Sequence, residues 1–126
     1  MRFASFVENG VHGLAVRRPA GDWAGLLEGE AGFPGSLETL LTGGDRLSDA
    51  AAVLARAKPV DLDRVTLLPV LSNPGKIICF GLNYADHSAE SGFKQPDYPT
   101  LFGRFNSSLI AHGADYPSQT VRATRL

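Results

Sequence analysis

The sequence has 126 residues, of which 44% are hydrophobic and 20% charged, and its formal net charge at neutral pH is −1. This composition is typical of one globular domain and excludes a disordered or low-complexity chain. The charge balance provides no basic surface of the kind that binds nucleic acid, and no run approaches the ~18 apolar residues of a membrane span. The N-terminus has no apolar core of secretory type, so we expect a cytoplasmic protein without nucleic-acid or membrane partners.

Residues 1–71 predict a small α+β domain. An Asn9-Gly10 pair between two strand-like runs is the strongest short-range hairpin signal, because both residues tolerate positive φ. Gly25, Gly29, Gly32 and the following Gly35, with no clear periodicity between them, predict that residues 23–34 form a loop with at most a short helical turn. The other expected elements are strands at 3–7 and 11–16, a helix at 36–41 with Ser36 as N-cap and Gly43-Gly44 at its end, a helix at 49–57 capped by Ser48, and a strand at 65–68.

A domain boundary is expected near residues 71–75, and residues 72–113 predict the opening of a second domain. The apolar run 76–80 reads as a strand that ends at Gly81. The roughly 50 residues after the boundary are too few to close a core of their own. We therefore expect residues 76–126 to pack poorly by themselves and strand 76–80 to leave an unpaired apolar edge.

His87 and Glu90 are the most informative residues of this second part. They stand three positions apart in an expected helix, so both side chains lie on one helix face. The carboxylate could then orient the imidazole and hold it ready as a general base. Two other interpretations remain open, namely a surface ion pair of little energetic weight and a pair of metal ligands.

Several neighbouring residues have simpler interpretations. Asn83 stands where a loop becomes a helix and is expected to cap it, while Tyr84 is expected to be a packing aromatic. Glu28 and Glu30 form a Glu-x-Glu pattern, but in a glycine-rich stretch they predict a solvated loop. Cys79 lies in an apolar run and is expected to be a buried, inert thiol.

Residues 76–92, with Gly81, Asn83, Tyr84, His87 and Glu90 in order, resemble the G-x-N-Y-x-x-H-x-x-E signature of the fumarylacetoacetate hydrolase family. Residues 99–109 are similar to the strand and Ser-rich substrate loop that follow this signature in the family. The hairpin and two helices upstream are similar to the domain that these enzymes place before the catalytic one. The resemblance covers residues 1–113.

The resemblance implies a mixed β-roll catalytic domain, a homodimer and a divalent metal, usually magnesium or manganese and sometimes calcium. Family members hydrolyse, decarboxylate or isomerise small oxo acids or diketo acids, often in aromatic catabolism. By this resemblance His87 is the catalytic base and Glu90 orients it. Arg104, Ser107 and Tyr84 are the implied substrate-binding residues, with the Arg104 guanidinium suited to a substrate carboxylate.

The chain departs from the family pattern in its metal ligands. The family uses three carboxylates downstream of the Ser-rich loop, whereas only Asp97 and Asp115 follow Glu90 here. Residues 114–126 do not resemble the family's continuation. We therefore expect a truncated catalytic domain that retains no metal and is inactive alone. The alternatives are a non-catalytic interaction module that pairs with an intact paralogue, and a pseudogene product.

Overall fold

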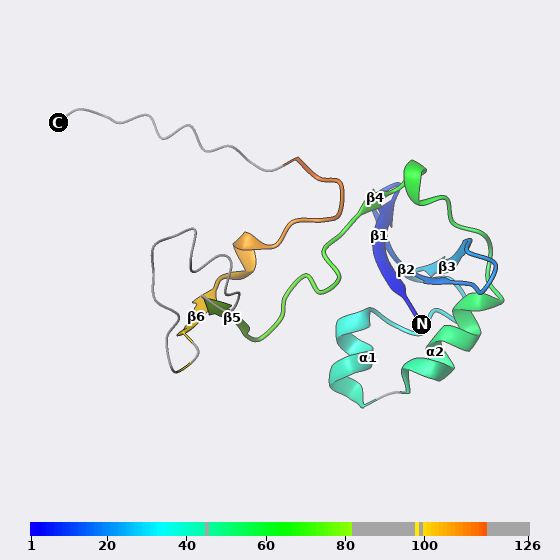
Figure 1. The fold of residues 1–126 in the computed structure, drawn as a ribbon. Coiled ribbons are helices and arrows are strands. Elements are labelled where there is room, and N and C mark those ends of the chain that lie inside the picture. Colours follow the sequence, from blue (N-terminus) through cyan, green and yellow to red (C-terminus); the bar gives the residue numbers. More distant parts are fainter. Residues whose placement is uncertain (45, 82–97, 99, 116–126) are drawn as a thin grey trace. The chain divides into compact units, whose positions relative to one another are not determined.

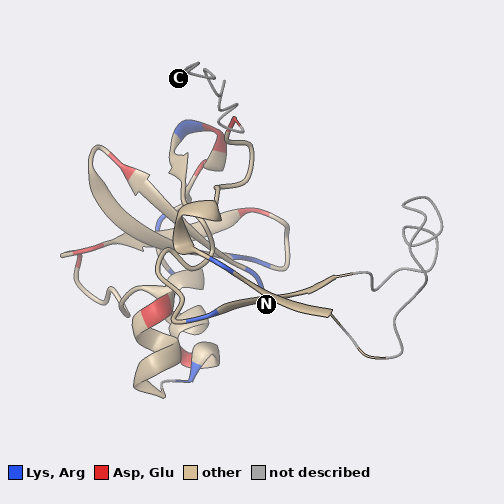
Figure 2. Cartoon of the chain, turned by 90° about the vertical axis from the view of Figure 1, so that its left-hand side faces the viewer, with Lys and Arg blue, Asp and Glu red and all other residues tan. Residues whose placement is uncertain are grey.

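The computed structural model describes residues 1–44, 46–81, 98 and 100–115. The chain divides into two units, one made of Met1–Val70 together with the described residues from Ile110 onward, and the other of Leu71–Leu109. Acidic and basic residues are interspersed over strands, helices and loops (Figure 2). No helix in the described ranges is long and apolar enough to cross a membrane.

The first unit is a small α+β fold with a four-stranded antiparallel sheet and two helices (Figure 1). The sheet has the order β3-β2-β1-β4, in which β1 and β2 are neighbours along the chain and form the expected hairpin. Both turn residues have positive φ, 51° at Asn9 and 82° at Gly10. The elements are β1 (Phe3–Glu8), β2 (Val11–Arg17), β3 (Trp23–Leu27), α1 (Leu37–Gly43), α2 (Leu47–Ala55) and β4 (Thr66–Leu67), with a 3₁₀ turn at Leu62–Arg64.

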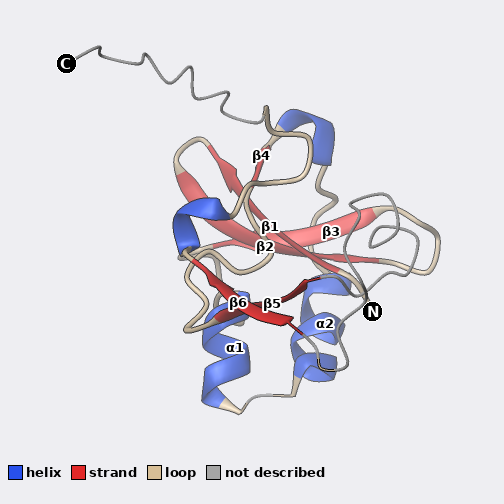
Figure 3. Ribbon diagram, turned by 60° about the vertical axis from the view of Figure 1, so that its left-hand side comes forward, coloured by secondary structure: helices blue, strands red, loops and turns tan. Residues whose placement is uncertain are grey.

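The core of this unit forms around the central strand β2. Both helices lie on the same side of the sheet (Figures 1 and 3), where α2 packs against β2 and β3. Phe6 is 1% exposed, and its ring lies so close to Gly13 on the paired strand that a Cβ there would be 2.4 Å from the ring. The other buried apolar residues are Leu14, Ala15, Val16, Ala24, Leu37, Leu40, Ala50, Ala51 and Leu54.

The first helix is capped as its sequence predicts. The Ser36 hydroxyl accepts a hydrogen bond from the backbone N–H of Thr39 at 3.1 Å, and Gly44 adopts the left-handed conformation at the other end. The prediction for the second helix is wrong at its start. Helix α2 begins at Leu47 with Arg46 at the N-cap position, and the Ser48 hydroxyl donates to the Asp49 carboxylate within the first turn.

The prediction that residues 23–34 form a loop is wrong for their first five residues. Trp23–Leu27 is strand β3, and it pairs antiparallel with β2. Gly25 lies opposite Ala15, where a Cβ would come within 2.6 Å of the Leu14 carbonyl oxygen, so the close approach of the two strands requires glycine. Only the later glycines of this stretch belong to turns.

The second unit contains β5 (Ile77–Gly81) and β6 (Thr100–Arg104), which form a two-stranded antiparallel ribbon (Figure 3). A 3₁₀ turn at Asn106–Ser108 follows β6. The expected strand at 76–80 is therefore present, but β6 pairs with one of its edges. A two-stranded ribbon is marginally stable without further packing.

Candidate active site

Strand β5 leads into the motif that carries the expected catalytic residues. The strand ends at Gly81, the first residue of the motif. Asn83, Tyr84, His87 and Glu90 lie outside the described residues, as do Asp86 and Asp97. The predicted pairing of His87 with Glu90 therefore stays a prediction, and so do the roles of these two residues.

The two remaining substrate-binding candidates lie on β6 and just after it. Arg104 is the last residue of β6, and Ser107 is the middle residue of the 3₁₀ turn, and both are exposed to solvent. The turn is held by the Ser108 hydroxyl, which donates to the Phe105 carbonyl at 2.7 Å. Exposed side chains at a strand end could contact a ligand, but within the described residues nothing encloses Arg104 or Ser107.

A side-chain hydrogen bond that the sequence did not predict joins the turn after β6 to the segment before β5. The Asn106 amide donates to the side-chain oxygen of Asn73 at 2.5 Å. These residues are 33 positions apart, and no local pattern connects them. Ser107 is thus held at the end of the ribbon where β5 begins.

The register of the ribbon separates Arg104 from the start of the motif. Arg104 lies opposite Ile77, whereas Gly81 lies opposite Thr100. With a rise of ~3.4 Å per residue, four steps place the level of Arg104 about 14 Å from Gly81 along the ribbon. In the described residues, Arg104 and Ser107 therefore share one end of the ribbon, and the motif leaves from the other end.

The two faces of the ribbon differ in exposure along β5, whereas every residue of β6 is exposed. Directly paired residues of an antiparallel ribbon point to the same face, so Cys79, Phe102 and Arg104 share one face with Ile77. Cys79 is half-buried, so the expectation of a buried thiol is wrong; among the described residues, β6 is the one strand that pairs with β5. The opposite face, here called the Ile78 face, carries Ile78, Phe80 and Leu101, which are 61%, 61% and 58% exposed.

Of the two glutamates in the Glu-x-Glu pattern of the first unit, Glu30 makes contacts that hold the fold. The Glu30 carboxylate accepts the backbone N–H of Leu27 at 2.6 Å and the Lys58 ammonium at 2.7 Å. These hydrogen bonds, the one from Leu27 first, lower the pKa of Glu30, and the same ion pair raises the pKa of Lys58. Residues 28–30 therefore form the expected solvated turn, and within it Glu30 is also paired with Lys58, 28 positions away in the sequence.

Among residues 1–44, 46–81, 98 and 100–115, no three His, Cys, Asp or Glu side chains are grouped as metal ligands would be. Asp115 is among these residues and joins no such group. The described residues do not fit a metal, and we derive no chemical step through one.

Comparison with known proteins relates this chain to larger enzymes. It is 41% identical over 90 residues to a Burkholderia ambifaria protein named "Putative hydrolase BamMC406_5393", a match that covers 63% of this chain and 30% of that protein. It is 39% identical over 75 residues to the rat protein "Oxaloacetate tautomerase Fahd2a, mitochondrial", which covers 59% of this chain and 24% of the rat protein. A Burkholderia cenocepacia protein is 40% identical over 90 residues.

No family model matches the chain, and no solved structure matches it. Over the matched part, the chain is similar to a putative hydrolase and to an oxaloacetate tautomerase, which supports the resemblance to the fumarylacetoacetate hydrolase family. The chain spans less than a third of the length of these relatives.

Proposed function

We propose that this chain carries the opening part of a catalytic site that acts on small oxo acids or diketo acids by hydrolysis, decarboxylation or tautomerisation. The observation that carries the proposal is the motif from Gly81 to Glu90 at the end of β5, in a chain related to a hydrolase and an oxaloacetate tautomerase. Fold-level analogy alone would not be sufficient, because one fold can carry many reactions.

In this proposal His87 is the general base. It removes a proton from water or from the carbon next to the substrate carbonyl, and Glu90 orients the imidazole and stabilises its protonated form. In the same proposal Arg104 and Ser107 bind the substrate carboxylate and Tyr84 contacts the substrate from the motif, which requires the chain after Gly81 to return about 14 Å along the ribbon to the level of Arg104. A magnesium or manganese ion would supply Lewis-acid stabilisation of the enolate in a complete family enzyme. We propose that the present chain retains no such ion, is inactive alone, and belongs to a homodimeric, β-roll architecture when complete.

A chimera tests this proposal. Residues 1–113 of this chain would be joined to the downstream part of the Burkholderia ambifaria relative and assayed on oxaloacetate and on an acylpyruvate. We expect turnover by the chimera, loss of turnover in His87→Ala, and a milder loss in Glu90→Ala. The control is His12→Ala, which changes an exposed histidine of β2. Equal activity of the His87 and His12 variants would contradict the proposal.

The Ile78 face favours a second candidate function, an interaction module that pairs with an intact paralogue. Three large apolar side chains on one face of a marginal ribbon are a typical protein-contact surface. Co-purification with the full-length relative should be lost in Phe80→Glu and kept in Leu41→Glu, since Leu41 is similarly exposed on α1. Capture that is the same for both variants would exclude this face as the contact.

A further inference from the structure

Two arginines face each other across the open end of the β1–β2 hairpin. The backbone N–H of Arg17 donates to the Arg2 carbonyl at 2.9 Å, which extends the register in which Phe3 lies opposite Val16. Directly opposed residues of an antiparallel pair point to the same face, and like charges in such a pair destabilise the sheet. The repulsion between these two arginines therefore lowers the stability of the hairpin, and a bound anion would reduce this repulsion.

The two arginines border an open hollow of about 470 Å³. None of the residues that line it is acidic; they are Met1, Arg2, Arg17, Arg18, Pro19 and Gly21. The nearby carboxylate of Asp22 is engaged elsewhere, because it accepts a hydrogen bond from Arg18 at 2.8 Å. The residues that line the hollow therefore carry positive charge and no negative charge, although the chain as a whole has a net charge of −1.

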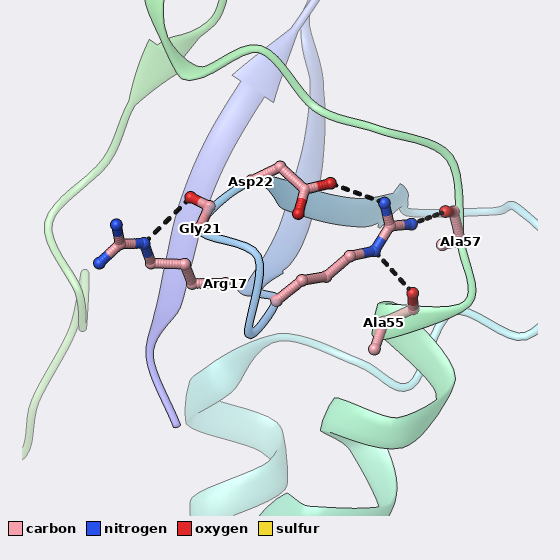
Figure 4. A network of polar contacts seen from close by, with 6 residues as sticks. Arg17, Gly21, Asp22, Ala55 and Ala57 are labelled. Atoms are coloured by element: carbon pink, nitrogen blue, oxygen red, sulfur yellow. Dashed lines mark hydrogen bonds and ion pairs between the residues drawn. The ribbon is translucent and has the colours of Figure 1, made fainter.

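The Arg17 guanidinium is held in place for a ligand. Its Nε donates to the Gly21 carbonyl at 3.0 Å, and the guanidinium points away from the Arg18 contacts on the other side of the turn (Figure 4). A Cβ at Gly21 would lie 3.5 Å from an Arg17 terminal nitrogen, so the group lies against this glycine. No hydrogen bond joins the two terminal nitrogens to another of the described residues. A guanidinium fork held in this way is well matched to a carboxylate or phosphate.

We propose that Arg2 and Arg17 form a binding site for a small oxyanion that carries two negative charges. The anion lies between the two guanidinium groups, accepts hydrogen bonds from the two terminal nitrogens of Arg17, and reduces the repulsion across the hairpin. The site belongs to the first unit and does not rest on the proposed catalytic function.

Titration of the full chain with inorganic phosphate at constant ionic strength tests the site. Amide NMR shifts of Arg2, Arg17 and Gly21 should saturate, and sodium chloride should not reproduce them. In Arg17→Gln and in Arg2→Gln the affinity should fall about fivefold or more, as expected for one partly exposed charge-assisted contact. Arg56→Gln, an exposed arginine at the end of α2, is the control and should bind as the unchanged chain does.

Malonate, a dicarboxylate of similar charge, distinguishes the source of the oxyanion. Saturable binding of both anions supports a general site for doubly charged oxyanions, and binding of phosphate alone supports one for phosphate groups. Shifts that rise linearly without saturation, or that are equal in the Arg17 and Arg56 variants, would overturn the proposal. Either result would mean that the two arginines attract anions nonspecifically and form no defined binding site.

Discussion

Replacing the half-buried Arg18 by Met should destabilise the first unit more than replacing any exposed arginine in it. The Arg18 guanidinium donates to the carbonyls of Ala55 and Ala57, at 2.8 and 2.7 Å, and to Asp22 (Figure 4). The first bond satisfies the carbonyl of Ala55, the last residue of α2, which has no partner inside the helix, and the second holds the Ala57 carbonyl two residues beyond the helix. One side chain therefore ties the turn after β2 to the end of α2.

The size of the effect follows from these contacts. The two bonds to carbonyls are worth roughly 1 kcal/mol each, and the exposed Asp22 pair adds at most about 0.5 kcal/mol. The Arg18 side chain is 24% exposed, which limits the sum, so we expect a loss of about 2 kcal/mol in the free energy of unfolding. Methionine keeps an unbranched apolar side chain, so the loss reports mainly on the polar contacts.

Urea unfolding measures this loss, with Arg17→Met as the matched control. Arg17 makes one exposed hydrogen bond, to Gly21, and its replacement should cost about 0.5 kcal/mol or less. If the two variants unfold at the same urea concentration with the same m-value, Arg18 does not hold the end of α2, and the argument from the Ala55 and Ala57 carbonyls is refuted.

Three further predictions concern the rest of the fold. Because the pKa of Glu30 is lowered in the folded state, its ion pair stabilises the fold fully above the ordinary pKa of 4.5, and this stabilisation is lost as the pH falls through the folded-state pKa. Glu30→Gln should therefore make the free energy of unfolding less dependent on pH below about pH 5. An unchanged pH dependence in this range would contradict the argument. Gly13→Ala should cost roughly 1–3 kcal/mol, because its Cβ would meet the Phe6 ring, whereas Gly75→Ala, with nothing within 4 Å, should be neutral in the same urea unfolding. Amide exchange should be slow in α1 and α2 and fast after Gly75, and equal protection would refute a weakly packed second unit.

Local sequence signals predicted those structural features that are stabilised by contacts between residues close together in the sequence. The Asn9-Gly10 turn and the Ser36 cap depend on residues within four positions, and both are present. Strand β3 was missed because Gly25 reads locally as a loop residue, whereas its close pairing with Ala15 is a contact across ten positions. The predicted start of α2 is wrong because serine is a preferred N-cap residue, whereas Ser48 is the second residue of the helix.

The chemistry of the candidate site stays a prediction, and its described geometry could not be predicted. The spacing of His87 and Glu90 is compatible with a base and its partner, and the relatives support the family resemblance. The position of Arg104 depends on the register of β5 with β6, which places it opposite Ile77. No local pattern specifies such a register, so the separation of Arg104 from Gly81 along the ribbon could not be predicted.

The most direct test of the central claim is the effect of His87→Ala on the steady-state kinetics of the chimera. A base acts mainly in the transition state, so kcat should fall about 100-fold or more while KM stays within about threefold. Circular dichroism and the His12→Ala variant would confirm that the fold is kept. If kcat stays within about twofold, a change of only ~0.4 kcal/mol in the barrier, His87 is not the base and the account of this motif is contradicted.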